Sequence, residues 1–155
     1  MLLYRSTSTG VEVLLVHPGG PFFRDRDDGW WTVPKGLVDE GEEPLAAALR
    51  EYAEEMGLDA PSQGPFFDLG SVRQKGGKTV RAWAVEGDCD PARARSNTFR
   101  LEWPPRSGRM HDFPEVDRAE FFPLEAARRK INPAQEPFLD RLEAFLRGAP
   151  DQAPE

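Results

Sequence analysis

The chain has 155 residues, of which 39% are hydrophobic, and this is the size and apolar content of one folded domain rather than of a disordered chain. Its net charge is −7, from 27 acidic and 20 basic residues, which disfavours bulk nucleic acid and anionic membranes unless the basic groups cluster. Cys89 is the only cysteine, which excludes an intramolecular disulfide and a thiolate zinc cluster. No apolar run approaches the about 20 residues of a membrane span, and no signal-peptide pattern occurs, so we expect a cytoplasmic protein.

The first part of the chain predicts two strands, a loop and one helix. MLLYR and VEVLLVH are predicted strands joined by the loop STSTG, and PGG ends the second. PFFRDRDDGWW is predicted as a polar loop bracketed by aromatics, followed by a short strand WTVPKG that Pro34 breaks. The strongest helix prediction covers residues 44–56, because Pro44 suits a first turn and Gly57 is placed to end the helix.

The second part predicts strands that lead into a closing helix. PFFDLGSVRQKGGKTVRAWAVEG is predicted as a hairpin around Gly76-Gly77, and SNTFRLEW as another strand. PPRSGRMHDFPEVD is predicted as a long loop, AEFFPLEAARRKI as a strand that enters a helix, and NPAQEPFLDRLEAFLRG as an amphipathic helix. We expect one α/β domain over residues 1–147, with a mixed sheet sandwiched between helices and a flexible tail at 148–155.

The stretch REYAEEMG carries three glutamates near the end of the predicted helix. A helical projection places Glu51, Glu54 and Glu55 on one face, and an apolar stripe that includes Tyr52 and Met56 on the other. Like charges at this spacing cost about 0.2–0.5 kcal/mol each, and anions near a helix C-terminus cost about 0.3–1 kcal/mol more. The residues alone leave two interpretations open, a solvated polar face and a site for a divalent cation such as Mg²⁺, which prefers carboxylate oxygens.

From Gly36 to Leu58 the sequence runs GLVDEGEEPLAAALREYAEEMGL. The spacing of its glycines, glutamates and arginine resembles the Nudix box, the signature of hydrolases that cleave a nucleoside diphosphate linked to another group. The preceding WTVPKGLVDEGE looks like the branch that includes dinucleoside polyphosphate hydrolases and predicted nucleoside triphosphate pyrophosphohydrolases. One departure is Tyr52, where the family usually has an aliphatic residue. The positions that match the box are Gly36, Glu42, Arg50, Glu51, Glu54, Glu55, Gly57 and Leu58.

The resemblance implies a Nudix fold and a metal site. It implies that Glu51, Glu54 and Glu55 ligate Mg²⁺ or Mn²⁺ together with the carbonyl of Gly36, and that Arg50 orients these glutamates, with support from Glu42. A further glutamate from a distant loop, six residues before an aromatic on a late strand, would be a metal ligand or base. Glu115 has this spacing to Phe121, while Asp112, Asp117 and Glu120 are its competitors.

The resemblance also implies a nucleotide substrate, with contacts that are less closely specified. Lys35, Arg106 and Arg109 are expected to contact phosphates, His111 to lie near the site, and Trp31 to stack on a base, with Phe22, Phe23 and Trp103 as other aromatic candidates. A dinucleoside polyphosphate or a nucleoside triphosphate is the expected substrate. The alternatives are an ADP-ribose or nucleotide-sugar pyrophosphatase and a module that senses a nucleotide without cutting it.

We expect no membrane or bulk nucleic acid partner, and a monomer or homodimer. Family members usually have several residues before the first strand, whereas here Met1 is followed at once by LLYR. The first strand is therefore expected to be shortened, or the start to be misplaced.

Overall fold

A mixed sheet of five strands forms the centre of the fold, and the computed structural model describes residues 1–35 and 41–148. Its strands are β1 (Leu2–Thr7), β2 (Gly10–Pro18), β3 (Phe67–Arg73), β4 (Thr79–Glu86) and β7 (Val116–Pro123). They lie in the order β3-β4-β1-β2-β7. β1 runs parallel to β4 and the other neighbours are antiparallel, which confirms the predicted mixed sheet.

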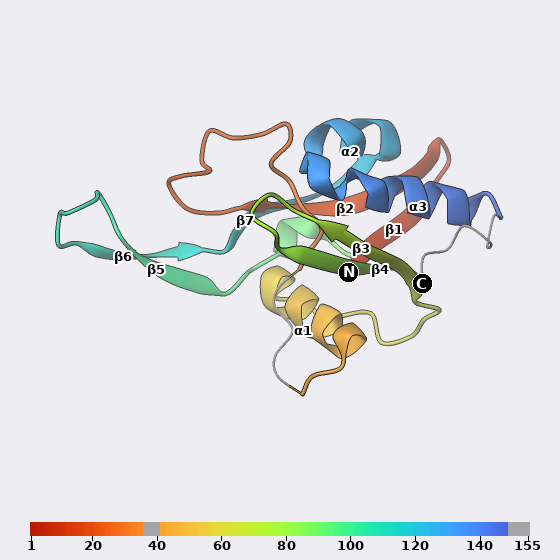
Figure 1. Ribbon diagram of the computed structural model, residues 1–155, viewed down its shortest axis with the longest axis horizontal. Helices are drawn as coiled ribbons and strands as arrows, with labels where there is room; N and C mark the ends of the chain where they lie inside the picture. Colours follow the sequence, from red (N-terminus) through yellow and green to blue (C-terminus); the bar gives the residue numbers. More distant parts are fainter. Residues whose placement is uncertain (36–40, 149–155) are drawn as a thin grey trace.

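Helices cover both faces of this sheet, as predicted. Figure 1 shows α1 (Pro44–Met56) on one side, and α2 (Leu124–Lys130) and α3 (Glu136–Leu146) together on the other. β4 shows why both faces need cover, because Val80, Ala82 and Ala84 pack into the core under α2 and α3, while Trp83 and Val85 pack into the core under α1. The chain also forms two short 3₁₀ helices, η1 (Pro91–Arg93) and η2 (Pro133–Gln135).

The bounds of α1 agree with the sequence prediction because local signals set both ends. The carboxylate of Glu43 accepts a hydrogen bond from the amide of Ala46, and Pro44 follows it in the first turn. Gly57 has φ 63° and donates its amide to the carbonyl of Ala53. Tyr52, the departure from the box pattern, is buried in the core under α1.

The segment predicted as one long loop after Trp103 contains a strand instead. β6 (Met110–Pro114) pairs with β5 (Thr98–Glu102) in a hairpin that projects from the body of the molecule, at the left of Figure 1. The turn-rich stretch PPRSGR occupies only the tip of this hairpin, and the strand after it forms because β5 supplies a partner.

The predicted strand WTVPKG is also different in the structure, where it makes two isolated bridges, Val16 with Thr32 and Trp31 with Ile131.

The loop that precedes WTVPKG is held by the buried imidazole of His17. Its Nδ1 contacts Oδ1 of Asp117 at 2.7 Å, and its Nε2 contacts the carbonyl of Arg26 at 2.6 Å. In the two described ranges, no helix has the length and apolar character needed to cross a membrane.

Candidate active site

Arg50 connects the carboxylates at the centre of the candidate site. Its Nε and Nη2 donate to the two oxygens of Glu42 at 2.8 and 3.0 Å, and its Nη1 donates to Glu51 at 2.8 Å and to Glu54 at 3.1 Å. These hydrogen bonds, with Glu42 foremost, hold the pKa of the guanidinium above its usual value. One cation thus lies among three of the predicted glutamates and offsets part of their mutual repulsion.

Glu55 contacts the segment before the box. Its Oε2 accepts the backbone amide of Lys35 at 2.5 Å. Burial raises the pKa of this carboxyl to about 7, although the amide and the charge of Lys35 oppose the rise. Glu55 is therefore in a drier environment than a solvated helix face would give.

Glu115 joins the site from the far end of the chain, between β6 and β7. Its amide donates to the carbonyl of Asn97 at 2.9 Å, and its carbonyl accepts the amide of Gly19 at 3.0 Å. Burial and then the charges of Glu51 and Glu54 raise the pKa of its carboxyl. The three carboxylates are therefore close enough to repel one another electrostatically.

The competing carboxylates of Glu115 are engaged or placed elsewhere. Asp117 contacts His17, Asp112 lies on β6 opposite Arg100, and Glu120 pairs with Leu15 along β7. Glu115 is bonded through Asn97 to the backbone of Glu54, which places it beside the glutamates of α1.

The donor chemistry of this site suits a hard divalent cation, since it consists of carboxylate oxygens. Within residues 1–35 and 41–148, no three Asp, Glu, His or Cys side chains lie close enough together to hold one ion. Arg50 explains part of this spacing, because it takes one oxygen each of Glu51 and Glu54. Gly36, the expected carbonyl ligand, lies outside the described residues.

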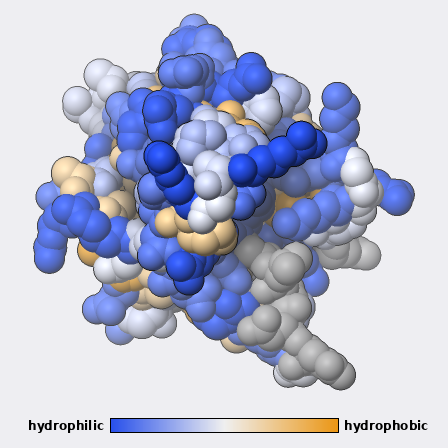
Figure 2. All heavy atoms as spheres, turned by 90° about the vertical axis from the view of Figure 1, so that its left-hand side faces the viewer, coloured by the Kyte–Doolittle hydropathy of each residue, from blue (hydrophilic) through white to orange (hydrophobic). Residues whose placement is uncertain are grey.

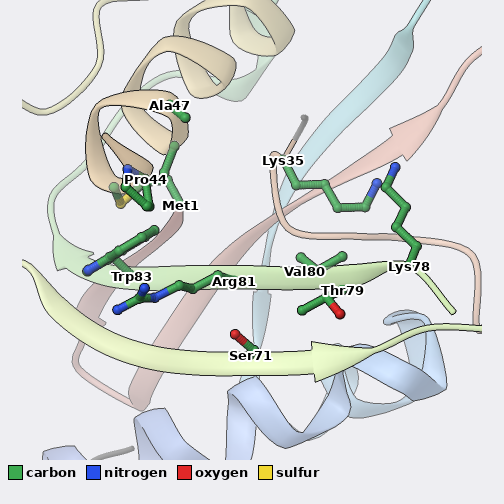
Figure 3. Close-up of a pocket in the computed structure, with 11 residues that line it drawn as sticks. Met1, Lys35, Pro44, Ala47, Ser71, Lys78, Thr79, Val80, Arg81 and Trp83 are labelled. Atoms are coloured by element: carbon green, nitrogen blue, oxygen red, sulfur yellow. The ribbon is translucent and has the colours of Figure 1, made fainter. Parts of the chain in front are cut away.

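A pocket of about 280 Å³ lies beside the acidic residues, between the start of α1 and β4. Figure 3 shows the side chains of Lys35 and Lys78 extending toward one another at one end of it. Burial and then the charge of Lys78 lower the pKa of Lys35, which agrees with two cations in close proximity. Because Lys35 also donates its amide to Glu55, a potential anion site adjoins the carboxylates.

The two neighbouring tryptophans have opposite environments. Trp31 is 1% exposed, and its Nε1 donates to Asp27 at 2.8 Å, so the prediction that Trp31 stacks on a base does not agree with its burial. Trp30 is 40% exposed and lines a second pocket of about 650 Å³ with Gln74, Lys75 and Asn132. Sequence reasoning missed Trp30, since the WW pair gave no signal for which ring is outside.

Three other predicted substrate contacts lie on the projecting hairpin. Arg106 and Arg109 are in its tip loop, and His111 is exposed on β6. None of the three lines either pocket described above. Sequence reasoning also missed Lys78, for which the only signal was its place directly after the Gly76-Gly77 turn.

Comparisons with known proteins identify the family of this chain. The family model for the NUDIX domain matches residues 1–142. An asymmetrical bis(5′-nucleosyl)-tetraphosphatase of Rattus norvegicus is 45% identical over 89 residues, which are 55% of this chain and 56% of the relative. An RNA pyrophosphohydrolase of Wolbachia pipientis subsp. Culex pipiens is 46% identical over 52 residues, 32% of each chain.

Among solved structures, an Ap4A hydrolase of C. elegans in a binary complex has a TM-score of 0.64 at 24% identity, covering 95% of this chain and 96% of that one. This similarity shows the fold. The chain spans about half the length of the first curated relative, 56%. With the family model matching nearly the whole chain, this protein belongs to the NUDIX domain family.

Proposed function

We propose that this protein hydrolyses a phosphoanhydride bond in a nucleotide, in a reaction that depends on Mg²⁺ or Mn²⁺. The observation that carries the proposal is that Lys35 joins two sites of opposite charge. Its amide binds Glu55 at the acidic cluster, and its side chain converges with Lys78 at the adjoining pocket. A site for a cation next to a site for an anion suits a metal-bound pyrophosphate.

Glu51, Glu54, Glu55 and Glu115, with the carbonyl of Gly36, are the residues that would hold the metal. The bound ion would screen the phosphate charge and lower the pKa of a coordinated water. Arg50, held by both oxygens of Glu42, positions Glu51 and Glu54. One of Glu54, Glu55 and Glu115 accepts the proton of the attacking water, and Lys35 and Lys78 bind the phosphate chain.

A dinucleoside polyphosphate is the proposed substrate, with a nucleoside triphosphate next. The tetraphosphatase of Rattus norvegicus supports this choice by its name and similarity. The second pocket supports it physically, because the exposed ring of Trp30 and the amide NH₂ groups of Gln74 and Asn132 suit a nucleobase. Gln74 also donates its backbone amide to the carbonyl of Lys78 at 2.7 Å, so this pocket lies near that lysine. ADP-ribose and nucleotide sugars are the alternative substrates. Cytoplasmic location and a monomeric or homodimeric state belong to the same proposal.

A substrate panel with Mg²⁺ and with Mn²⁺, analysed for products by mass, tests this function. We expect the parent to release a nucleotide and a phosphate-bearing fragment, and Glu54→Gln and Glu55→Gln to lose this activity. Glu125→Gln, on α2, removes an equal charge from the other face of the sheet and is the control. If the parent binds a nucleotide but cleaves none of the panel, the protein is a sensing module and the hydrolase proposal is wrong.

A further inference from the structure

The β5–β6 hairpin differs from the rest of the structure in where it lies. Among the described residues, β5 and β6 pair only with each other, outside the five-stranded sheet. Strands of this length extend about 14 Å between their first and last residues. An isolated two-stranded hairpin is marginally stable in water, so a projecting hairpin calls for a physical reason.

The base of the hairpin is attached to the acidic helix. The amide of Asn97 donates to the carbonyl of Glu54 at 3.0 Å, and the amide of Arg95 donates to the carbonyl of Met56 at 2.7 Å. The hairpin then ends at Glu115, which bonds back to Asn97. The β5–β6 hairpin, residues 98–114, is called the arm below. It starts at the candidate active site and extends away from it (Figure 1).

The arm has the opposite charge to the whole chain. From Thr98 to Pro114 it carries Arg100, Arg106 and Arg109 against two carboxylates, Glu102 and Asp112, whereas the chain has net charge −7. Figure 2, which looks onto the end of the molecule with the hairpin, shows strongly hydrophilic side chains around small apolar patches.

These three arginines form no ion pair among the residues that the structure describes, in contrast to many others. Arg5, Arg81, Arg128 and Arg147 each pair with carboxylates elsewhere on the surface. The basic groups that the chain leaves unpaired on the arm are therefore available to an anionic partner.

The tip loop holds its shape through its own hydrogen bonds. The amide of Trp103 donates to the carbonyl of Arg109 at 2.9 Å, and the two oxygens of Glu102 accept the amides of Arg106 and Gly108 at 3.0 and 3.1 Å. Glu102 therefore closes the loop. Arg106 has φ 61°, a conformation that glycine adopts more readily, yet the position carries a guanidinium.

Aromatic rings accompany these arginines. Phe22, 59% exposed, packs edge-on against Trp103 with ring centroids 5.3 Å apart, and the exposed Met110 begins β6 beside them. Proteins hold single-stranded nucleic acid by placing basic side chains along its phosphate backbone and by stacking aromatic rings on its unpaired bases. The hairpin carries both kinds of side chain.

Protection of a strand edge and contact between two copies of the chain both fit the arm less well. Charged residues protect exposed strand edges, but Arg106 and Arg109 lie in the tip loop, outside the strands, and so guard no edge. Pairing of two such arms from two copies of the chain would bring their unpaired arginines together. A mononucleotide at Glu54 would leave the tip, about 14 Å beyond the strand base, without contact.

We propose that the β5–β6 hairpin is a binding arm for single-stranded nucleic acid, with Arg106 and Arg109 on the phosphates and Trp103 and Phe22 against the bases. This partner was not expected from the sequence because the net charge of the whole chain is negative. The arm binds independently of hydrolysis, so the proposal does not depend on the proposed function.

The test is fluorescence anisotropy of labelled 12-nucleotide single-stranded RNA and DNA with the full chain, in EDTA, at several salt concentrations. We expect saturable binding to at least one of the two, and weaker binding to a duplex, whose bases are unavailable for stacking. The variant R106Q/R109Q is expected to lose about tenfold in affinity and to reduce the salt slope by about 1.4, since each single-strand phosphate contact contributes about 0.7.

Two further variants separate binding from folding and from net charge. R106G relieves the left-handed backbone and is expected to unfold no more easily than the parent, yet to bind less. R93Q/R147Q removes the same charge from η1 and from the end of α3, and is expected to bind as the parent does.

Several outcomes would overturn the proposal. These are no binding of either oligonucleotide at low salt, equal binding of the duplex, or equal losses in R93Q/R147Q and R106Q/R109Q. A fourth outcome comes from sedimentation, which measures the oligomeric state. If R106Q/R109Q changes the oligomeric state but not the affinity for oligonucleotides, the arm is a contact between copies of the chain.

Discussion

Arg50 binds both carboxylate oxygens of Glu42, at 2.8 and 3.0 Å, across the start of α1. Arg50 belongs to the second turn of this helix and Glu42 precedes the helix, so the pair fixes how residues 42 and 43 lie against the helix. The same guanidinium reaches Glu51 and Glu54, and the position of Glu42 therefore bears on both proposed metal ligands.

Replacing Glu42 by glutamine tests this dependence. Glu42→Gln keeps the shape but removes the charge that holds Arg50, and we expect a loss of about 10–100-fold in kcat or metal affinity, the range for residues that orient ligands. The neighbour Glu43→Gln is a matched control, because Glu43 contacts the amide of Ala46 and not Arg50. Equal activity of the two variants in steady-state hydrolysis would contradict the positioning role.

Metal removal is the second test. EDTA should abolish hydrolysis and added Mg²⁺ should restore it, while a metal at 100 times its Kd should stabilise the fold by about 2.7 kcal/mol. Thermal denaturation with and without Mg²⁺ measures this, and the stabilisation should vanish in Glu54→Gln/Glu55→Gln. If the double variant keeps the metal-induced rise in Tm, the ion binds elsewhere.

Lys78 provides the third prediction. Lys78→Gln removes one of the two cations at the pocket beside α1, and we expect KM for a dinucleoside polyphosphate to rise by about tenfold, in line with loss of one charged hydrogen bond. The rise should shrink at high salt, which screens the interaction. Arg73→Gln, on the strand before the same turn, is the control. An equal rise in KM for this variant would mean that Lys78 acts only through the net charge of the protein and does not contact the substrate.

The local parts of this fold could be predicted from the sequence. Pro44 and Gly57 indicated both ends of α1, and Gly76-Gly77, with φ of 90° and 86°, indicated the turn between β3 and β4. Each depends on residues that are close in the chain. The spacing within REYAEEMG likewise indicated the acidic residues, because a helix fixes which side chains share a face.

The features that could not be predicted depend on contacts between distant segments. β6 forms because β5 pairs with it, and the turn residues before it hid this partner. Trp31 rather than Trp30 is buried because it packs against Phe122 of β7, with ring centroids 4.9 Å apart. The position of Lys78 next to Lys35 joins a hairpin turn to a segment more than 40 residues earlier.

The chain has two histidines, and they provide a matched pair for the fourth prediction. His17→Phe leaves the carboxylate of Asp117 and the carbonyl of Arg26 without their buried imidazole partner, which should cost about 1–3 kcal/mol in the free energy of unfolding. His111→Phe, at an exposed site on β6, should change it by less than about 0.5 kcal/mol. Urea denaturation measures both, and similar values would show that His17 does not anchor its loop.

The last prediction concerns acid stability and Asp27. Hydrogen bonds from Lys130, at 2.8 and 2.9 Å, and from Trp31 hold the pKa of Asp27 below its usual value. A lowered pKa contributes stability above the unfolded value of about 3.9, and this is lost as the pH falls through the folded value. Asp27→Asn should therefore lower Tm by no more than about 2–4 °C at pH 7, because the pair is exposed.

As the pH falls below 4, the Tm values of the parent and Asp27→Asn should converge, because the parent then protonates Asp27 and loses the same interaction. Asp25→Asn is the control, since Asp25 lies in the same loop and forms no ion pair among the described residues. Its Tm should follow that of the parent at every pH. A difference for Asp27→Asn that stays constant from pH 7 to pH 3 would mean that packing around Trp31, and not the charge of Asp27, joins the loop to α2.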